Sequence, residues 1–160
     1  MTESATVRES LGCDLAAEVL RRFGSVRLHI TGASMLPVLW PGDVVSVSGR
    51  DTMQTQPGEV VVFQRDGRLV AHRVVGRTTR QGRLHWITRG DSAERDDAPV
   101  SHDDLLGRVC AIERGSERVT PHQSGMARLV AGVLRRSVLC TRLALHFRKQ
   151  EWEIRSWRIA

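Results

Sequence analysis

The sequence predicts a mostly β fold, a β-rich α+β protein with a compact antiparallel sheet, an N-terminal helix and a C-terminal basic amphipathic helix. Short runs of alternating apolar and polar residues recur between residues 26 and 113, and turn dipeptides separate them. No helical pattern lies between these runs, which favours antiparallel pairing. We expect three parts: an N-terminal tail and helix (1–25), a β domain (26–115), and a linker with a helical extension (116–160).

The N-terminal helix is predicted from apolar residues at helical spacing, and Gly24 is its expected end. These apolar residues are Leu11, Leu15, Val19, Leu20 and Phe23. Residues 1–10 are polar, and we expect them to fray.

Six strands are predicted in the β domain. Their expected ranges are 26–31, 43–48, 59–64, 68–77, 84–89 and 105–113. The turn signals between them are Pro41-Gly42, Pro57-Gly58, Asp66-Gly67 and Gln81-Gly82. An Asp-Gly pair between two strand patterns is a strong hairpin signal, so we expect a tight turn at Asp66-Gly67.

The C-terminal part of the chain, from Ser124, contains no proline and carries apolar residues at helical intervals with arginines among them. This pattern predicts a basic amphipathic helix that also bears Trp152 and Trp157. Such a helix can lie in a membrane interface or pack across the β domain with its arginines outward. Peripheral contact with a membrane or a membrane partner is therefore one of the two roles that the sequence leaves open.

The composition narrows the classes of partner. The net charge of +6, in a chain whose only lysine is Lys149, fits either an acidic partner or an ordinary solvated surface. Nucleic acid is not an expected partner, because the chain has no helix-turn-helix, zinc-finger or aromatic stacking motif and no tyrosine. Cys13, Cys110 and Cys140 lack metal-ligand spacing, so we expect no cofactor, no metal and a reducing compartment.

The sequence shows no targeting or membrane-spanning pattern. The first twenty residues carry several charges and lack the apolar core of a signal peptide. No stretch approaches the roughly 20 apolar residues of a transmembrane helix. The expected location is the cytoplasm or the periphery of a membrane.

The segment "TGASMLPVLWPGD" (31–43) contains a candidate nucleophile, Ser34. Small residues precede this serine and Pro37 stiffens the chain after it. A serine hydroxyl is a weak nucleophile until a neighbouring base takes its proton. The catalytic interpretation therefore requires a base elsewhere in the chain, and without one the segment is a surface loop.

Candidates for the base and for an orienting acid lie further along the chain. His72 stands inside the apolar strand pattern "LVAHRVVGR", where an ionisable side chain is either functional or on the polar face of the strand. The segment "ITRGDSAERDDAPVSHDDLLGRV" holds five aspartates and one glutamate. It is an acidic surface loop, or it supplies a buried carboxylate that holds a histidine in one tautomer.

Three segments, in this order, resemble the motifs of the type I signal peptidase family, serine peptidases whose fold is shared with the self-cleaving repressor peptidases. The first family motif has a Ser-Met pair, a proline and then Gly-Asp, similar to "GASMLPVLWPGD" here. "VAHRVVG" resembles the His-Arg-Val motif of the endoplasmic-reticulum and archaeal branch. "TRGDSAERDD" resembles that branch's Gly-Asp motif, which ends in paired aspartates. The resemblance covers residues 26–112 and implies that the β domain is a peptidase domain.

The resemblance implies a role for each matching residue. Ser34 is implied as the nucleophile, His72 as the general base, and Asp97 as the acid that orients the histidine. Asp91 is implied as a structural residue and is the alternative acid. The expected reaction is endopeptidase cleavage of a peptide or precursor protein through an acyl-enzyme, as in signal-peptide processing.

The resemblance also implies an oxyanion hole, to which the backbone N–H of Ser34 contributes. Gly32 is expected beside it, and Met35 is expected either on the substrate wall or in the core.

The lysine count supports a histidine base independently of the resemblance. A Ser/Lys dyad would have to use Lys149, which lies outside the matching segments. A self-cleaving repressor is disfavoured because too few residues precede the first strand for a DNA-binding domain. The chain differs from signal peptidases in having no transmembrane helix before the serine, and in carrying Ser92-Ala93 where that branch has asparagines. The alternative function is a non-catalytic peptide-binding or scaffold module that keeps the fold.

Overall fold

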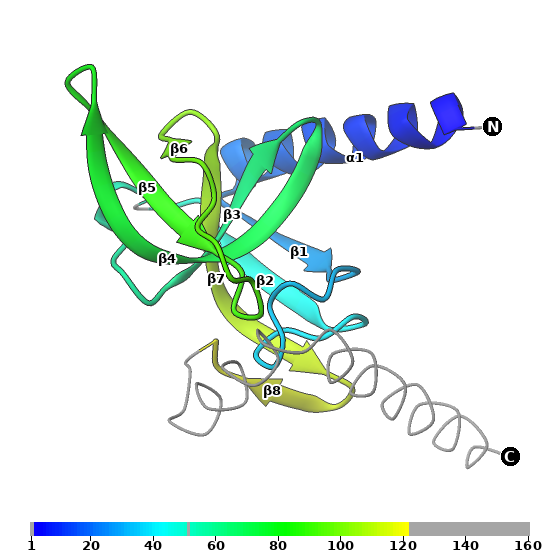
Figure 1. The fold of residues 1–160 in the computed structure, drawn as a ribbon. Helices are drawn as coiled ribbons and strands as arrows, with labels where there is room; N and C mark the ends of the chain where they lie inside the picture. The colour runs from blue at the N-terminus through cyan, green and yellow to red at the C-terminus, as the bar shows by residue number, and fades with distance from the viewer. Residues whose placement is uncertain (1, 51, 122–160) are drawn as a thin grey trace, which may run out of the picture.

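The predicted mostly β fold class is confirmed by a computed structural model of the chain (Figure 1). The structure describes the backbone of residues 2–50 and 52–121, with the side chains from residue 11 onward. Within these residues, one antiparallel sheet of eight strands forms the body of the protein, and one α-helix precedes it. The predicted C-terminal basic helix lies outside the described residues.

The strands follow one another by antiparallel pairing in the order β1-β2-β7-β3-β4-β5-β6, and β8 pairs with β7. The elements in chain order are α1 (Thr2–Phe23), β1 (Ser25–His29), β2 (Val44–Ser48), the 3-10 helix η1 (Thr52–Gln54), β3 (Val60–Arg65), β4 (Arg68–Arg80), β5 (Arg83–Arg89), β6 (Val100–Ser101), β7 (Leu105–Arg114) and β8 (Glu117–Val119). All six predicted strands are present, and β6 and β8 are two short strands that the sequence pattern did not indicate.

The two dipeptides Asp66-Gly67 and Gln81-Gly82 form the predicted tight turns. Asp66-Gly67 joins β3 to β4, and both of its residues have positive φ, at 51° and 71°. Gln81-Gly82 joins β4 to β5 with φ of 50° and 75°. Positive φ at both central residues is the type I′ conformation that matches the twist of paired strands. The Asp66-Gly67 turn sets the register that brings His72 opposite Val61.

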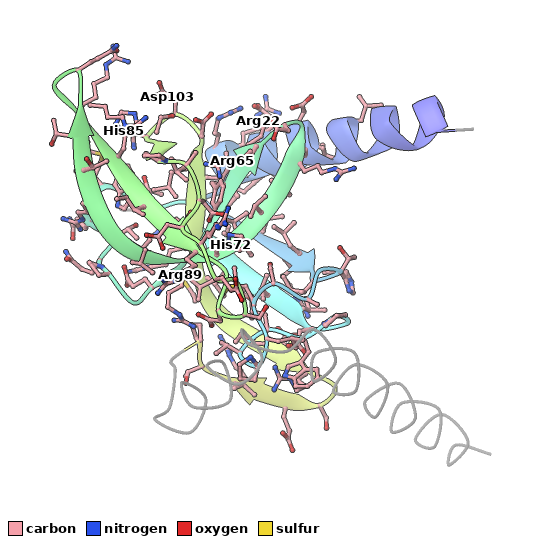
Figure 2. The ribbon with its side chains drawn as sticks, in the orientation of Figure 1. Arg22, Arg65, His72, His85, Arg89 and Asp103 are labelled. Atoms are coloured by element: carbon pink, nitrogen blue, oxygen red, sulfur yellow. The ribbon has the colours of Figure 1, made fainter. Side chains whose placement is uncertain are left out.

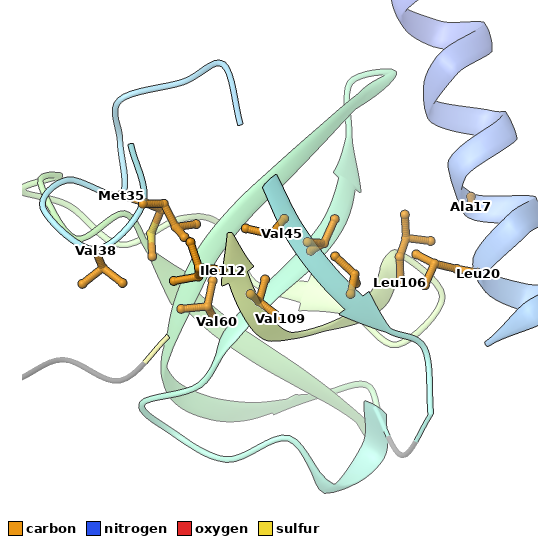
Figure 3. Packing of buried hydrophobic residues seen from close by; sticks show 12 residues of the cluster. Ala17, Leu20, Met35, Val38, Val45, Val60, Leu106, Val109 and Ile112 are labelled. Atoms are coloured by element: carbon orange, nitrogen blue, oxygen red, sulfur yellow. The ribbon is translucent and has the colours of Figure 1, made fainter. Parts of the chain in front are cut away.

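The core lies on both faces of β3, which explains why this strand is a continuous apolar run instead of an alternating one. Val60 and Val62 point to one cluster, and Val61 and Phe63 point to the other. Figure 3 shows the larger cluster, which extends from Leu20 of α1 at one end to Met35 at the other. The same core therefore packs the helix and supports the loop that carries Ser34.

Helix α1 differs from the prediction in its start and in its buried face. It begins at Thr2, not after residue 10, because residues 2–10 contain no glycine or proline to interrupt it. The side chains that pack on the sheet are Cys13, Ala16, Ala17 and Leu20. Leu11, Leu15 and Phe23 are exposed by 63%, 66% and 71%. Small residues let the helix approach the sheet closely, so the larger ones are left outside.

Among the described residues, no helix combines the length and the apolar character needed to cross a membrane. In Figure 1 the helix α1 extends away from one end of the sheet.

Candidate catalytic site

Ser34 lies on the loop between β1 and β2 (residues 30–43), here called the Ser34 loop. Buried apolar side chains anchor this loop to the core, and hydrogen bonds to Asp43 anchor its end. Leu36 and Leu39 are fully buried, whereas Ser34 itself is exposed. Asp43 accepts hydrogen bonds from the Trp40 N–H at 2.8 Å and from Arg114 Nη2 at 2.7 Å. The apolar side chains and the Asp43 carboxylate thus hold the loop while the serine hydroxyl remains accessible.

His72 lies on β4 (Figure 2), and its ring is directed at Ser34. His72 Nε2 is 2.9 Å from Ser34 Oγ, and the Phe63 ring packs edge-on against the imidazole with centroids 6.1 Å apart. The His72 side chain is only 12% exposed. Its position is therefore set by strand pairing and by packing.

Asp97 lies on the loop between β5 and β6, the acid loop (residues 90–99), and completes the chain of contacts. His72 Nδ1 is 2.6 Å from Asp97 Oδ2, and Thr88 Oγ1 donates to the same oxygen at 2.7 Å. The Asp97 N–H donates to the Thr88 carbonyl at 2.8 Å. Thr88 is fully buried, so it ties the acid to strand β5 by two hydrogen bonds.

The Asp97 carboxyl is held in its ionised form. Burial by itself would raise the pKa of this carboxyl. The hydrogen bonds from His72 and Thr88, with the charges of His72 and Arg65, outweigh burial and place the pKa of Asp97 below its ordinary value. An ionised carboxylate only accepts hydrogen bonds, so His72 Nδ1 carries the proton. When the ring carries this one proton, Nε2 is the acceptor for the proton of Ser34 Oγ.

Asp91 does not join this chain of contacts. Its two oxygens accept from Arg73 Nε at 2.8 Å and Arg73 Nη2 at 2.7 Å. Arg73 Nη1 also donates to the Gly58 carbonyl at 2.6 Å. Asp91 is 2% exposed and Arg73 7% exposed, so this is a buried, bidentate ion pair that joins the acid loop to the middle of β4.

The acid loop and the Ser34 loop are in direct contact. The Ser92 N–H donates to the Ser34 carbonyl at 3.0 Å, and Ser92 Oγ lies 2.9 Å from the same oxygen and 3.1 Å from the Ala33 carbonyl. Gly90 allows this approach, because a Cβ there would lie 2.6 Å from the Ser34 carbonyl oxygen. The two loops therefore pack backbone to backbone at the serine.

A cavity of about 430 Å³ opens beside Ser34 and His72. Its walls come from β1, the Ser34 loop and β2 to β4, and are mostly apolar; they include Leu28, Ile30, Met35, Leu69 and Ala71. Gly32 and Met35 line it, and Met35, 2% exposed, also belongs to the core cluster.

Two unpaired strand edges border this cavity. Within the described residues, β1 pairs only with β2, and β4 pairs with β5 only from Arg73 onward. Within the described residues, the outer edge of residues 69–72 is therefore left without a partner strand. Similarly, the N–H of Ser34 makes no hydrogen bond within the described part of the chain. These backbone groups are available to a bound ligand.

The structure brings Ser34, His72 and Asp97 together from three separate segments, and it adds residues that the motif analysis did not assign. Thr88 and Ser92 hold the acid and the serine loop, and Arg73 pairs with Asp91. Thr88 had a signal in the sequence, since it alternates with Trp86 on the buried face of its strand. Ser92 had none beyond its place in the motif.

Comparison with known proteins adds no assignment: neither the models of known protein families nor the curated proteins contain a match to this chain. Among the described residues, no group of three or more His, Cys, Asp or Glu side chains is placed to hold a metal ion.

Proposed function

We propose that this protein is a serine endopeptidase similar to the type I signal peptidases, which cleaves a peptide or precursor protein through an acyl-enzyme. The observation that carries the proposal is the hydrogen-bonded series Ser34 Oγ, His72 Nε2 and Nδ1, and Asp97 Oδ2, with distances of 2.9 and 2.6 Å. A nucleophile, a base and an acid that orients the base are the parts that serine acyl transfer requires.

The proposed reaction has two halves, acylation and deacylation, and Ser34, His72 and Asp97 take part in both. His72 Nε2 takes the proton of Ser34 Oγ as the oxygen attacks the substrate carbonyl carbon, and the C–N bond then breaks as the imidazolium returns that proton to the leaving amine. Water, activated by the same nitrogen, hydrolyses the ester and restores Ser34. The unpaired N–H of Ser34 is the expected donor to the oxyanion. Asp97 stabilises the imidazolium formed in each step.

The unpaired strand edges support a peptide as the substrate. An extended peptide can pair with an exposed strand edge, and its alternate side chains then enter pockets beside that edge. The apolar cavity next to Ser34 offers one such pocket. The resemblance to signal peptidases implies small residues before the scissile bond.

The proposal is tested by labelling the purified protein with a fluorophosphonate, a probe that reacts with activated serines. We expect one label per chain in the native protein, none in Ser34→Ala, and a rate lower by several orders of magnitude in His72→Ala, because a triad acts as a unit. Ser101→Ala is the matched control, since Ser101 Oγ contacts Asp104 on another loop. A native protein that binds peptides but takes up no label at Ser34 would instead be the non-catalytic peptide-binding module.

A further inference from the structure

Ser92 of the acid loop contacts the backbone of the Ser34 loop through both its hydroxyl and its N–H. Its hydroxyl lies within hydrogen-bonding distance of two successive carbonyl oxygens, those of Ala33 and Ser34, and its N–H donates to the second. Each of these carbonyls belongs to one of the two peptide units that flank the Ser34 side chain. One half-buried residue of the acid loop thus contacts the backbone on both sides of the nucleophile.

The orientation of a peptide unit determines where its N–H points. In a trans peptide the C=O and the following N–H point in opposite directions. The Ala33 carbonyl faces Ser92 and also accepts from the Leu36 N–H at 3.2 Å, so the Ser34 N–H of the same unit points away from the acid loop. That N–H makes no hydrogen bond within the described part of the chain, as an oxyanion donor requires.

The Ser34 carbonyl accepts from the Ser92 N–H at 3.0 Å, and the single proton of the Ser92 hydroxyl is shared between this oxygen, at 2.9 Å, and the Ala33 oxygen, at 3.1 Å. Gly90 brings the backbones together at this point, because any larger residue would collide with the Ser34 carbonyl oxygen. No other side chain among the described residues donates to these two carbonyls. The contacts concern the backbone of Ser34, and none of them involves His72 or Asp97.

We propose that Ser92 is a positioning residue. By holding the two peptide units that flank Ser34, it orients the Ser34 N–H that donates to the oxyanion and fixes the position of the Ser34 hydroxyl. The inference rests on the proposed function. Ser92 is also one of the positions at which the chain departs from the signal peptidase motif, so the serine hydroxyl would be this protein's own means of holding the loop.

The experiment compares Ser92→Ala, Ser92→Thr and the control Ser101→Ala as purified full chains, with a p-nitrophenyl ester as substrate. We expect Ser92→Ala to lower kcat about 10- to 100-fold. Loss of an oxyanion donor itself typically lowers kcat about 10²–10³-fold, and we expect a smaller effect here because the Ser92 N–H still holds the Ser34 carbonyl. We expect an unchanged KM, an unchanged midpoint of the pH–rate profile, and a Tm equal to that of Ser101→Ala. Ser92→Thr keeps the hydroxyl and should recover most of kcat.

Three results would overturn the inference while leaving the proposed function intact. These are a Ser92→Ala enzyme with native kcat, a loss of kcat that Ser92→Thr does not recover, and a loss accompanied by a shift of the pH midpoint or by a lower Tm than the control. If the native protein shows no acylation that depends on Ser34, the proposed function fails, and the inference fails with it.

Discussion

Asp91 and Asp97 carry the same carboxyl group on the same loop, yet their surroundings give them different tasks. Asp91 is closed in by the guanidinium of Arg73, and Asp97 faces the imidazole of His72. Both oxygens of Asp91 accept hydrogen bonds from Arg73, whereas Asp97 Oδ2 lies 2.6 Å from His72 Nδ1. The contacts therefore favour Asp97 over Asp91 as the acid.

Exchanging each aspartate for asparagine separates these tasks. Asp97→Asn should leave the fold intact and lower kcat by about 10⁴, because an amide favours the wrong tautomer of His72; this factor is the one known for the corresponding change in a serine protease. Asp91→Asn should lower the free energy of unfolding by about 3 kcal/mol, since it leaves the buried Arg73 charge without its full partner. The measurements are ester hydrolysis and urea unfolding of both variants.

Asp96→Asn is the matched control, because Asp96 directly precedes Asp97 and its 49% exposed side chain pairs with the partly exposed Arg89 at 3.3 Å. We expect native activity and native stability from it. Loss of activity without loss of stability in Asp91→Asn, together with an active Asp97→Asn, would reverse the assignment. Native activity in all three variants would leave a Ser/His dyad.

At the scale of elements, the site is a junction of two loops that touch through their backbones. Gly90 and Gly107 are the two glycines at which a Cβ would lie 2.6 Å from a carbonyl oxygen, that of Ser34 and that of Ser48 respectively. Real side chains do not tolerate such a distance, so a larger residue forces the neighbouring backbone to move. At Gly90 the backbone that moves carries Ser34, the proposed nucleophile.

Gly90→Ala should therefore reduce activity by more than its effect on stability explains. We expect a loss of about 1–3 kcal/mol in the free energy of unfolding, the usual cost of overpacking, and a larger fall in fluorophosphonate labelling than in the folded fraction. Gly107→Ala is the comparison, since it introduces the same collision away from the site. Gly76→Ala meets nothing within 4 Å and should change neither quantity. Equal labelling rates for the folded Gly90→Ala and Gly107→Ala proteins would contradict this expectation.

The sequence predicted most elements because their patterns are local. Alternating or continuous apolar runs located six strands, and the Asp-Gly and Gln-Gly pairs located two turns. Strands β6 and β8 have only two and three residues, too few for an alternating pattern. The buried face of α1 could not be predicted from the size of its apolar residues, since the approach of the helix to the sheet favours Cys13, Ala16 and Ala17 over Leu11 and Leu15.

At the scale of the whole molecule, the order of strands assembles the site. Ser34 and His72 are 38 residues apart, and His72 and Asp97 are 25 apart. Strand β7 lies between β2 and β3 in the sheet. It therefore joins β1 and β2, which flank the Ser34 loop, to β3 and to β4, the strand that carries His72. The motifs suggested which residues belong together, but nothing local in the sequence indicates the pairing of β7 or the contacts of Thr88 and Ser92. Those depend on the folded sheet.

The acid Asp97 also links the site to the stability of the whole protein. Its pKa is lower in the folded protein than the value of about 3.9 for an unfolded aspartate, so the folded state favours the ionised form. This contribution is complete above the unfolded pKa and is lost as the pH falls through the folded pKa. The Asp97→Asn variant lacks the carboxyl group, so it cannot make this contribution to stability at any pH. We therefore expect the difference in free energy of unfolding between native protein and Asp97→Asn, measured by urea unfolding, to narrow as the pH falls below about 4. Asp96→Asn should show no comparable trend, and a difference for Asp97→Asn that stays constant or widens in that range would mean that the carboxylate does not gain from its partners His72 and Thr88.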